Sequence, residues 1–289
     1  MRNNFKTMVL MAGLGALFVL VGQLLGGTSG AITALVIAGL INFGMYFFSH
    51  KIALASAKAK PAEEKDLPNV YSIVRSLAQR ENMPMPKIYL IDSPQPNAFA
   101  TGRNPKNAAV AVTSGILTLM DHSELEGVLA HELSHVKNRD ILISTIAATV
   151  AVALSFLTRI AFWTGGDRRR NDPISGVIMI ASLILAPLAA MVIQMAISRS
   201  REYQADRSGA EITGSPLNLA RALEKLEAGT AKIPMQVNPS TAQLFIADPL
   251  KAFGRSGSTG GLARMFSTHP PITERVRRLT DMAQSGIIR

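Results

Sequence analysis

Two histidines and a glutamate form the pattern HExxH in this chain, as His131, Glu132 and His135. Residues four apart on an α-helix lie one turn apart and about 40° from each other around its axis. Two imidazoles in this arrangement can act as neighbouring ligands of one metal ion, with the glutamate beside the ion but not bound to it. The alternative is that two of the five histidines fall at helical spacing as ordinary core or surface residues.

The segment before this pattern has the signals of a helix start. Asp121 is followed three residues later by Glu124, which is a capping-box pattern. The residues that mark the buried face of the predicted helix are Leu125, Val128, Leu129 and Val136. A helix that begins here carries both histidines on one face, which favours the metal-binding interpretation.

A catalytic zinc ion usually has three protein ligands and keeps a fourth position for water. The chain has no cysteine, so the ligands must be histidine, aspartate or glutamate. The candidates after His135 are His269 and the carboxylates, among which Glu202 and Asp206 lie four residues apart on one helical face. Glu202 can bind the metal while Asp206 orients a ligand histidine. A solvated, charged helix face is the alternative.

Composition places the chain at a membrane. Apolar residues make up 48% of it, charged residues only 17%, and the mean hydropathy is +0.22, which is more apolar than usual for a soluble domain. The net charge of +10 fits either nucleic acid or anionic lipid as a partner. No nucleic-acid-binding motif is present, and the basic clusters flank apolar runs. We therefore expect a lipid bilayer as partner and no nucleic acid.

Residues 1–50 are expected to form a transmembrane hairpin. Apolar runs at 8–25 and 31–48 are separated by a Gly- and Ser-rich turn at 26–30. A cleaved signal peptide is the alternative for the first run, and the second run argues against it. Basic residues before the first run and after the second place both ends of the hairpin in the cytosol.

The remaining chain divides into three parts, and its predicted fold class is α+β, mainly helical, with a small mixed β-sheet and two to four transmembrane helices. Residues 51–140 form the first part of a cytosolic catalytic domain, with a helix at 69–80, strands at 87–91 and 108–113, and an edge strand at 97–102. Residues 141–197 hold two apolar runs, at 141–163 and 174–197. Residues 198–289 form the second part, with a polar helical stretch to about Glu227 and a final helix from near Pro270.

The two apolar runs at 141–197 are expected to form a second membrane hairpin. Arg168, Arg169 and Arg170 lie in the loop between them, and on the outer face they would oppose the positive-inside rule. A shallow or protein-buried helical pair is therefore the alternative.

Several motifs in one order resemble those of the HtpX family of membrane-bound zinc metallopeptidases, which are of gluzincin type and related to CAAX prenyl proteases. They are VLAHELSHV at 128–136, SRSREYQAD at 198–206 and STHPP at 267–271, with PNAFATG at 96–102 and NPSTAQLFIADPL at 238–250. The resemblance covers essentially the whole chain.

The resemblance implies a role for each residue of the site. His131, His135 and Glu202 would bind one Zn²⁺ per subunit, and Glu132 would be the catalytic acid and base. Asn97 and His269 would contact the substrate or stabilise the tetrahedral intermediate. The alternatives are a turn residue after Pro96 for Asn97, and a residue preceding a proline-initiated helix for His269.

The expected function is that of a zinc-dependent endopeptidase in the bacterial inner membrane, multi-pass, with its active site on the cytoplasmic side. Five residues separate His135 from the apolar run at Ile141, so the site should lie near the bilayer surface. Its expected substrates are polypeptides, above all misfolded or damaged membrane proteins, in quality control and the stress response. A CAAX-type prenyl-protein peptidase is the enzymatic alternative, and a non-enzymatic membrane scaffold is the other.

Overall fold

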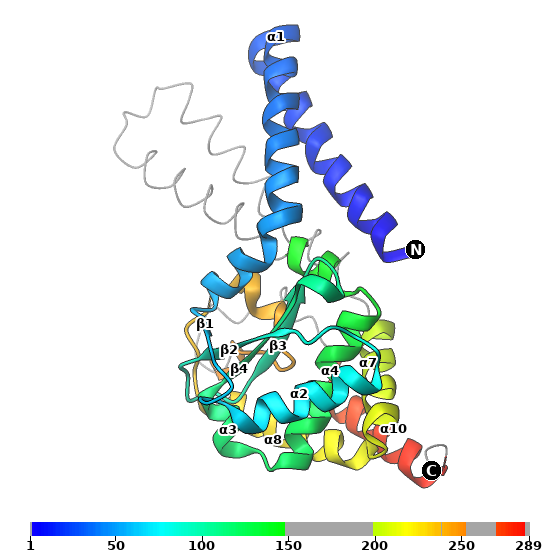
Figure 1. The fold of residues 1–289 in the computed structure, drawn as a ribbon. Helices are drawn as coiled ribbons and strands as arrows, with labels where there is room; N and C mark the ends of the chain where they lie inside the picture. The colour runs from blue at the N-terminus through cyan, green and yellow to red at the C-terminus, as the bar shows by residue number, and fades with distance from the viewer. Residues whose placement is uncertain (1, 148–198, 238, 253–269, 287–289) are drawn as a thin grey trace.

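A computed structural model of the 289-residue chain describes all residues except 1, 148–198, 238, 253–269 and 287–289 (Figure 1). The helices are α1 (Arg2–Ser56), α2 (Pro68–Arg80), α3 (Ser114–Leu119), α4 (His122–Lys137), α7 (Arg199–Thr213), α8 (Pro216–Lys232) and α10 (Ile272–Gln284), with short 3-10 helices η1 (Pro105–Asn107) and η2 (Pro239–Leu244). The strands are β1 (Lys60–Pro61), β2 (Lys87–Ile91), β3 (Ala98–Gly102) and β4 (Ala108–Thr113). Residues 141–147 are also helical.

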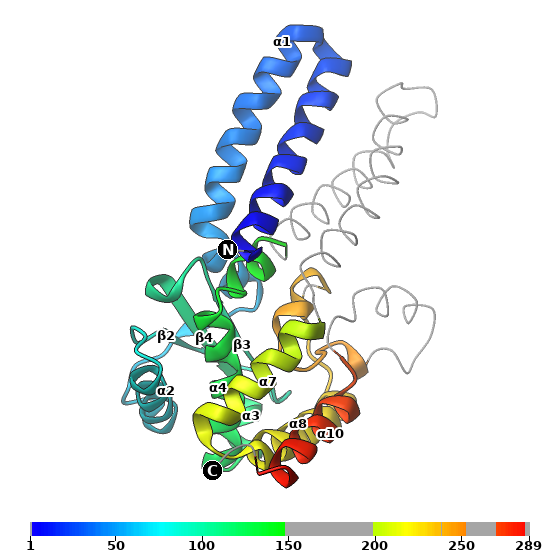
Figure 2. The ribbon, with the colours of Figure 1, turned by 90° about the vertical axis from the view of Figure 1, so that its right-hand side faces the viewer.

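Helix α1 folds back on itself as a hairpin that projects from the rest of the molecule (Figure 2). The chain reverses at Gly26 and Gly27, the first two residues of the segment expected to form the turn. Gly27 has a φ of 59°, a region that glycine adopts without the steric cost of a side chain. Both ends of the hairpin therefore lie on the side of the folded domain, as Figure 2 shows.

The second arm of the hairpin has the properties of a membrane-spanning helix. Within the described residues, Gly26–Ser56 is the one helix long and apolar enough to cross a bilayer, with a mean hydropathy of 1.9. Its apolar side chains face outward, with Leu35 60%, Leu40 68% and Phe43 60% exposed. In the first arm the apolar helical segment Met11–Leu20 is shorter than this criterion requires.

The four strands form one mixed sheet in the order β1-β2-β4-β3. β2 and β4 are parallel, whereas β1 and β3 pair antiparallel with their neighbours. The predicted bounds of β2 and β4 are confirmed, and β3 is an edge strand as predicted, beginning one residue later at Ala98. β1 was not predicted, because two residues are too short to show an alternating pattern.

The sheet is buried on both faces because successive side chains of a strand point to opposite sides. Val110 and Val112 belong to a core shared with α2, α4 and α8. Phe99 and Ala111 point the other way and pack with Leu54 in the last turns of α1, in a second core cluster. The foot of the hairpin is therefore part of the folded domain.

The polar helical stretch predicted up to about Glu227 consists of two helices, α7 and α8. They are separated at Gly214, which has a φ of 69°, and α8 begins with Pro216 in its first turn. The final helix begins at Ile272, with Pro271 as its N-cap residue. Residues 148–197, with most of the first of the two apolar runs, Arg168 to Arg170 and the whole of the second, lie outside the described residues.

Candidate metal centre

Helix α4 carries the HExxH residues, and its start is fixed by the predicted capping box. The Asp121 carboxylate accepts a hydrogen bond from the Glu124 amide at 2.9 Å, and the Glu124 carboxylate accepts one from the Asp121 amide at 3.1 Å. Lys225 on α8 binds the same buried Glu124 carboxylate at 2.6 Å. The four apolar residues of the predicted face, Leu125, Val128, Leu129 and Val136, are at most 2% exposed. The helix is thus held at its first turn and along its apolar face.

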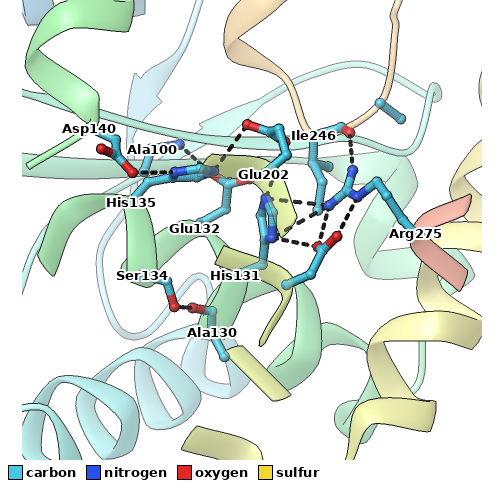
Figure 3. Close-up of polar contacts among 12 residues, drawn as sticks. Ala100, Ala130, His131, Glu132, Ser134, His135, Asp140, Glu202, Ile246 and Arg275 are labelled. Carbon is cyan, nitrogen blue, oxygen red and sulfur yellow. Dashed lines mark hydrogen bonds and ion pairs between the residues drawn. The ribbon is translucent and has the colours of Figure 1, made fainter. Parts of the chain in front are cut away.

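Helix α7 lies directly against α4 and brings Glu202 to the two histidines (Figure 3). Glu202 Oε2 is 3.8 Å from His131 Nε2, and Oε1 is 3.4 Å from His135 Nε2. Gly209 allows this close packing, since a Cβ atom there would lie 2.9 Å from the backbone nitrogen of His131. Three side chains separated by up to 71 positions in the sequence therefore meet at one point.

The spacing of these three side chains fits a metal ion. One candidate ligand atom from each of His131, His135 and Glu202 lies within 4.8 Å of the others. Tetrahedral zinc with bonds of ~2.0–2.1 Å holds neighbouring ligand atoms roughly 3.3 Å apart. The Glu202 carboxylate lies 3.4 Å from His135 Nε2 and 3.8 Å from His131 Nε2. Two imidazoles and one carboxylate are a ligand set of catalytic zinc, with one position left for water. The donor chemistry and the geometry both fit a divalent ion of this kind.

Asp206 and Arg275 both contact the ring of His131. Asp206 Oδ1 lies 2.9 Å from His131 Nδ1. The Arg275 guanidinium donates to both oxygens of the same carboxylate, through Nη2 at 2.6 Å and Nε at 2.8 Å. This places Asp206 where the sequence predicted a residue that orients a ligand histidine. A carboxylate on the free ring nitrogen fixes the imidazole so that Nε2 faces the metal position.

Arg275 was left out of the predicted site, yet its side chain is fully buried and contacts His131, a candidate metal ligand. Its Nη1 donates to the backbone oxygen of Ile246 at 3.3 Å (Figure 3). From the sequence, Arg275 was not assigned to the site because ion pairing alone would account for an arginine in these motifs. The available signal was its spacing, because Arg275 falls between Ile272 and Leu279 on the apolar face of α10.

Asp140 is a second residue that the sequence analysis missed. Its Oδ2 lies 3.3 Å from His135 Nδ1, so each histidine has a carboxylate on its Nδ1. Asp140 lies three residues past the end of α4, after Arg139, which has a φ of 58°, and its amide donates to the His135 oxygen at 2.9 Å. An aspartate five residues after the second histidine, just past the helix end, was the signal that could have identified it.

Glu132 lies in the same site and is bonded to the sheet. Its side chain is buried, and Oε2 accepts a hydrogen bond from the backbone amide of Ala100 in β3 at 2.7 Å. Next to Ala100 in the same strand, the hydroxyl of Thr101 lies 2.9 Å from the hydroxyl of Thr145 in the helical residues 141–147. The edge strand therefore contacts both the HExxH helix and the start of the third apolar run.

Asn97 is fully buried, and its side chain forms hydrogen bonds with the backbone of Ala98 and of Ala247. Its Nδ2 donates to the Ala247 oxygen at 2.8 Å, and its Oδ1 accepts from the amides of Ala98 at 3.1 Å and Ala247 at 3.3 Å. It joins the start of β3 to the segment after η2. His269 lies outside the described residues. The substrate roles of both residues stay predictions.

The charges of the site act differently on its two histidines. Burial, together with the charge of Arg275, lowers the pKa of His131 to about 4 although Asp206 opposes this. Burial would also lower the pKa of His135, but Asp140, Glu202 and Glu132 outweigh it and raise the pKa to about 9. The lowered pKa of His131 favours its neutral form, which is the form that binds a metal. The carboxylates around His135 favour a positive charge at this point, which is what a divalent cation supplies.

Comparisons with known proteins agree with this geometry. Residues 64–283 match the model of peptidase family M48. A protein named protease HtpX homolog from Thermodesulfovibrio yellowstonii is 53% identical over 286 residues, covering 98% of this chain and 99% of the relative. One of the same name from Syntrophobacter fumaroxidans is 52% identical, covering 98% of this chain and 100% of the relative.

A solved structure shows the same fold at a larger distance. The crystal structure of S. mikatae Ste24p matches with a TM-score of 0.52 and 21% sequence identity, covering 96% of this chain and 65% of that one. The hairpin, the HExxH helix and the full-length relatives together define a membrane metallopeptidase. The chain belongs to peptidase family M48, among the HtpX proteases, as its sequence motifs implied.

Proposed function

We propose that this chain is a zinc-dependent endopeptidase that cleaves misfolded or damaged membrane proteins from the cytoplasmic side of the bacterial inner membrane. The observation that carries the proposal is the meeting of His131 and His135 on α4 with Glu202 on α7, with Glu132 in the same site. Each histidine has its own carboxylate, which is how metal-binding histidines are usually oriented.

In this proposal His131 and His135 bind zinc through Nε2, and Glu202 binds it through its carboxylate. A zinc ion held there supplies Lewis acidity toward the scissile carbonyl and lowers the pKa of water. Glu132 takes the proton from the attacking water on its carboxylate and delivers it to the leaving amine. The hydrogen bond from Ala100 to Oε2 of Glu132 holds this carboxylate beside the edge strand.

Asn97 and His269 complete the proposed site as residues that act on the substrate. The bonds between Asn97 and Ala247 support a contribution through the backbone, because they hold the segment after η2 against the start of β3. A buried asparagine so bonded fixes the conformation of the strand next to Glu132.

The fold supports access from the membrane. The last turns of α1 pack against the side chain of Phe99 in β3, and Thr101 contacts Thr145 just beyond the HExxH helix. The strand that contacts Glu132 is therefore attached both to the apolar hairpin, through Phe99, and to residues 141–147, through Thr101. A segment of a membrane-embedded substrate has a short path to this strand. We propose a multi-pass arrangement in the membrane, with α1 beside that path.

The substitution Glu132→Gln tests the proposal. It removes the proton acceptor and none of the three ligands, so we expect peptidase activity on casein to fall by at least ~10²–10⁴-fold with zinc still bound at one per chain. Metal analysis and casein cleavage, with and without a chelator, measure both effects. Wild-type turnover by this variant would refute the assignment. Absence of zinc and of cleavage in the wild-type protein would favour a scaffold, and cleavage of only a prenylated peptide would favour a CAAX-type peptidase.

A further inference from the structure

The last turns of α1 have the residue order expected where a helix leaves a bilayer. A hydrocarbon core of ~30 Å takes about 20 helical residues, so an arm that starts at Gly26 leaves it near Met45. Tyr46, Phe47 and Phe48 follow, and aromatic residues of this kind are enriched at the membrane interface. His50 and Lys51 come next in the chain, at the level of the lipid headgroups.

Two cations from the folded domain join them at this level. The guanidinium of Arg103, which follows β3, lies 4.7 Å from the ring centre of Phe47. Lys87 starts β2, and its register partner Ala109 pairs with Thr101, so Lys87 and Arg103 lie at the same end of the sheet. We call the set His50, Lys51, Lys87 and Arg103 the α1 collar.

The collar carries positive charge that the described part of the chain does not neutralise. Its three cations are Lys51, which lies 5.5 Å from the ring centre of Phe48, Arg103 beside Phe47, and Lys87. None of the ion pairs among the described residues includes any of these three cations. Basic residues that protein carboxylates leave unpaired are suited to an external anion.

Hydrogen-bonding groups in the collar also lack partners. The Nδ1 atom of His50 is buried without a hydrogen-bond partner among the described residues, and so is the hydroxyl of the neighbouring Ser49. Buried polar atoms are nearly always hydrogen-bonded in proteins, so the unpartnered Nδ1 of His50 indicates a missing ligand or water. The charge and the unused hydrogen-bonding capacity point to the same kind of ligand, an oxyanion.

We propose that the α1 collar binds the phosphate headgroup of one anionic phospholipid. A lipid phosphate arrives at this height above the hydrocarbon core, and its acyl chains lie along the apolar side chains of α1, where Phe43 and Phe48 are 60% and 48% exposed. A free phosphate ion gains nothing from those side chains. The collar is thus a lipid site built from residues other than those of the metal centre, and it goes beyond the proposed peptidase function.

Lipid retention in native mass spectrometry tests the site. The full-length protein is released from micelles that contain equal amounts of phosphatidylglycerol and phosphatidylcholine. The collar variant Lys51→Gln/Lys87→Gln/Arg103→Gln is compared with a control of equal charge, Lys65→Gln/Arg221→Gln/Lys232→Gln. Each basic residue near an anionic surface contributes a factor of about five in affinity. We expect one phosphatidylglycerol per wild-type and control chain, and retention at least ~10-fold lower in the collar variant.

Two further measurements keep the test decisive. Lys51 and Lys87 are exposed, so their single substitutions leave the fold intact and should each lower retention about fivefold. The charge-conserving variant Lys51→Arg/Lys87→Arg should retain the lipid. Equal retention by wild type and collar variant, or equal retention of both lipids by the wild type, would overturn the proposal. Displacement of phosphatidylglycerol by inorganic phosphate at comparable concentration would show a phosphate site and overturn the lipid assignment.

Discussion

The two histidines proposed as metal ligands lie one turn apart on the same helix, but the protein holds them in different ways. His131 is 1% exposed and is fixed by Asp206 on α7, which is itself bound by Arg275 on α10. His135 is 15% exposed and is fixed by Asp140, which lies three residues past the end of α4. One histidine therefore depends on the packing of three helices, whereas the other depends on a local turn. We therefore expect substitutions in α7 and α10 to weaken metal binding mainly through the position of His131.

Loss of Glu202, the ligand that both histidines share, should have the largest effect on the site. In Glu202→Ala two histidines remain without a charged ligand, so we expect zinc affinity to fall sharply and casein cleavage to be lost. Metal content after dialysis, together with activity at saturating zinc, measures this. Glu211→Ala is a control on the exposed side of α7. Zinc retained at the wild-type level would show that another residue is the third ligand.

Arg275→Ala should have the next largest effect, because it leaves the buried Asp206 carboxylate unpaired. Removing one partner of a buried ion pair costs about 3–5 kcal/mol of stability. Here it also releases Asp206, the carboxylate that contacts His131, from its bonds to Arg275. Thermal unfolding in detergent and zinc affinity measure the two consequences. Arg278→Ala, an exposed arginine of the same helix, should change neither by much. Equal effects of the two substitutions would contradict the buried network.

Asp206→Asn tests the orienting role itself while keeping the size of the side chain. An orienting residue of a metal ligand typically contributes ~10–100-fold in metal affinity or activity, less than a ligand does. Zinc titration against a competing chelator, compared with Glu202→Ala, gives the ratio. If Asp206→Asn removed zinc as completely as Glu202→Ala, the roles of the two carboxylates would have to be exchanged.

Asp140→Asn should have the smallest effect of this series. The distance of 3.3 Å to His135 is longer than the 2.9 Å of the Asp206 contact, and His135 is partly exposed, so water can replace the lost partner. We expect at most ~10-fold weaker zinc binding and little change in thermal stability. An effect larger than that of Asp206→Asn would mean that the local turn, and not the helix packing, dominates the metal site.

The residues predicted from sequence are those with a local signal. Spacing along one helix identified His131 and His135, the capping box identified the helix start, and alternation identified β2 and β4. Glu202 was selected because Asp206 stands four residues later, so even the distant ligand carried a local pattern.

The residues that sequence reasoning missed are those whose role arises only from contacts between distant segments. Arg275 becomes a buried partner of Asp206 because α10 packs on α7 and α8, and no neighbour in its own sequence records this. The short strand β1 is defined by its pairing with β2 and not by its two residues. Local periodicity predicts elements and their faces, but the partner of a face is a property of the whole fold.

Gly209 binds no metal, yet the geometry of the metal site depends on it through the distance between α7 and α4. The separation of α7 from α4 is set by the absence of a side chain at this position, where a Cβ atom would approach the backbone of His131 and Ala130. A single methyl group there would push Glu202 away from both histidines without altering any donor atom. Among natural variants, Gly209→Ala would therefore look like a conservative substitution, yet we expect it to lower the affinity for the metal.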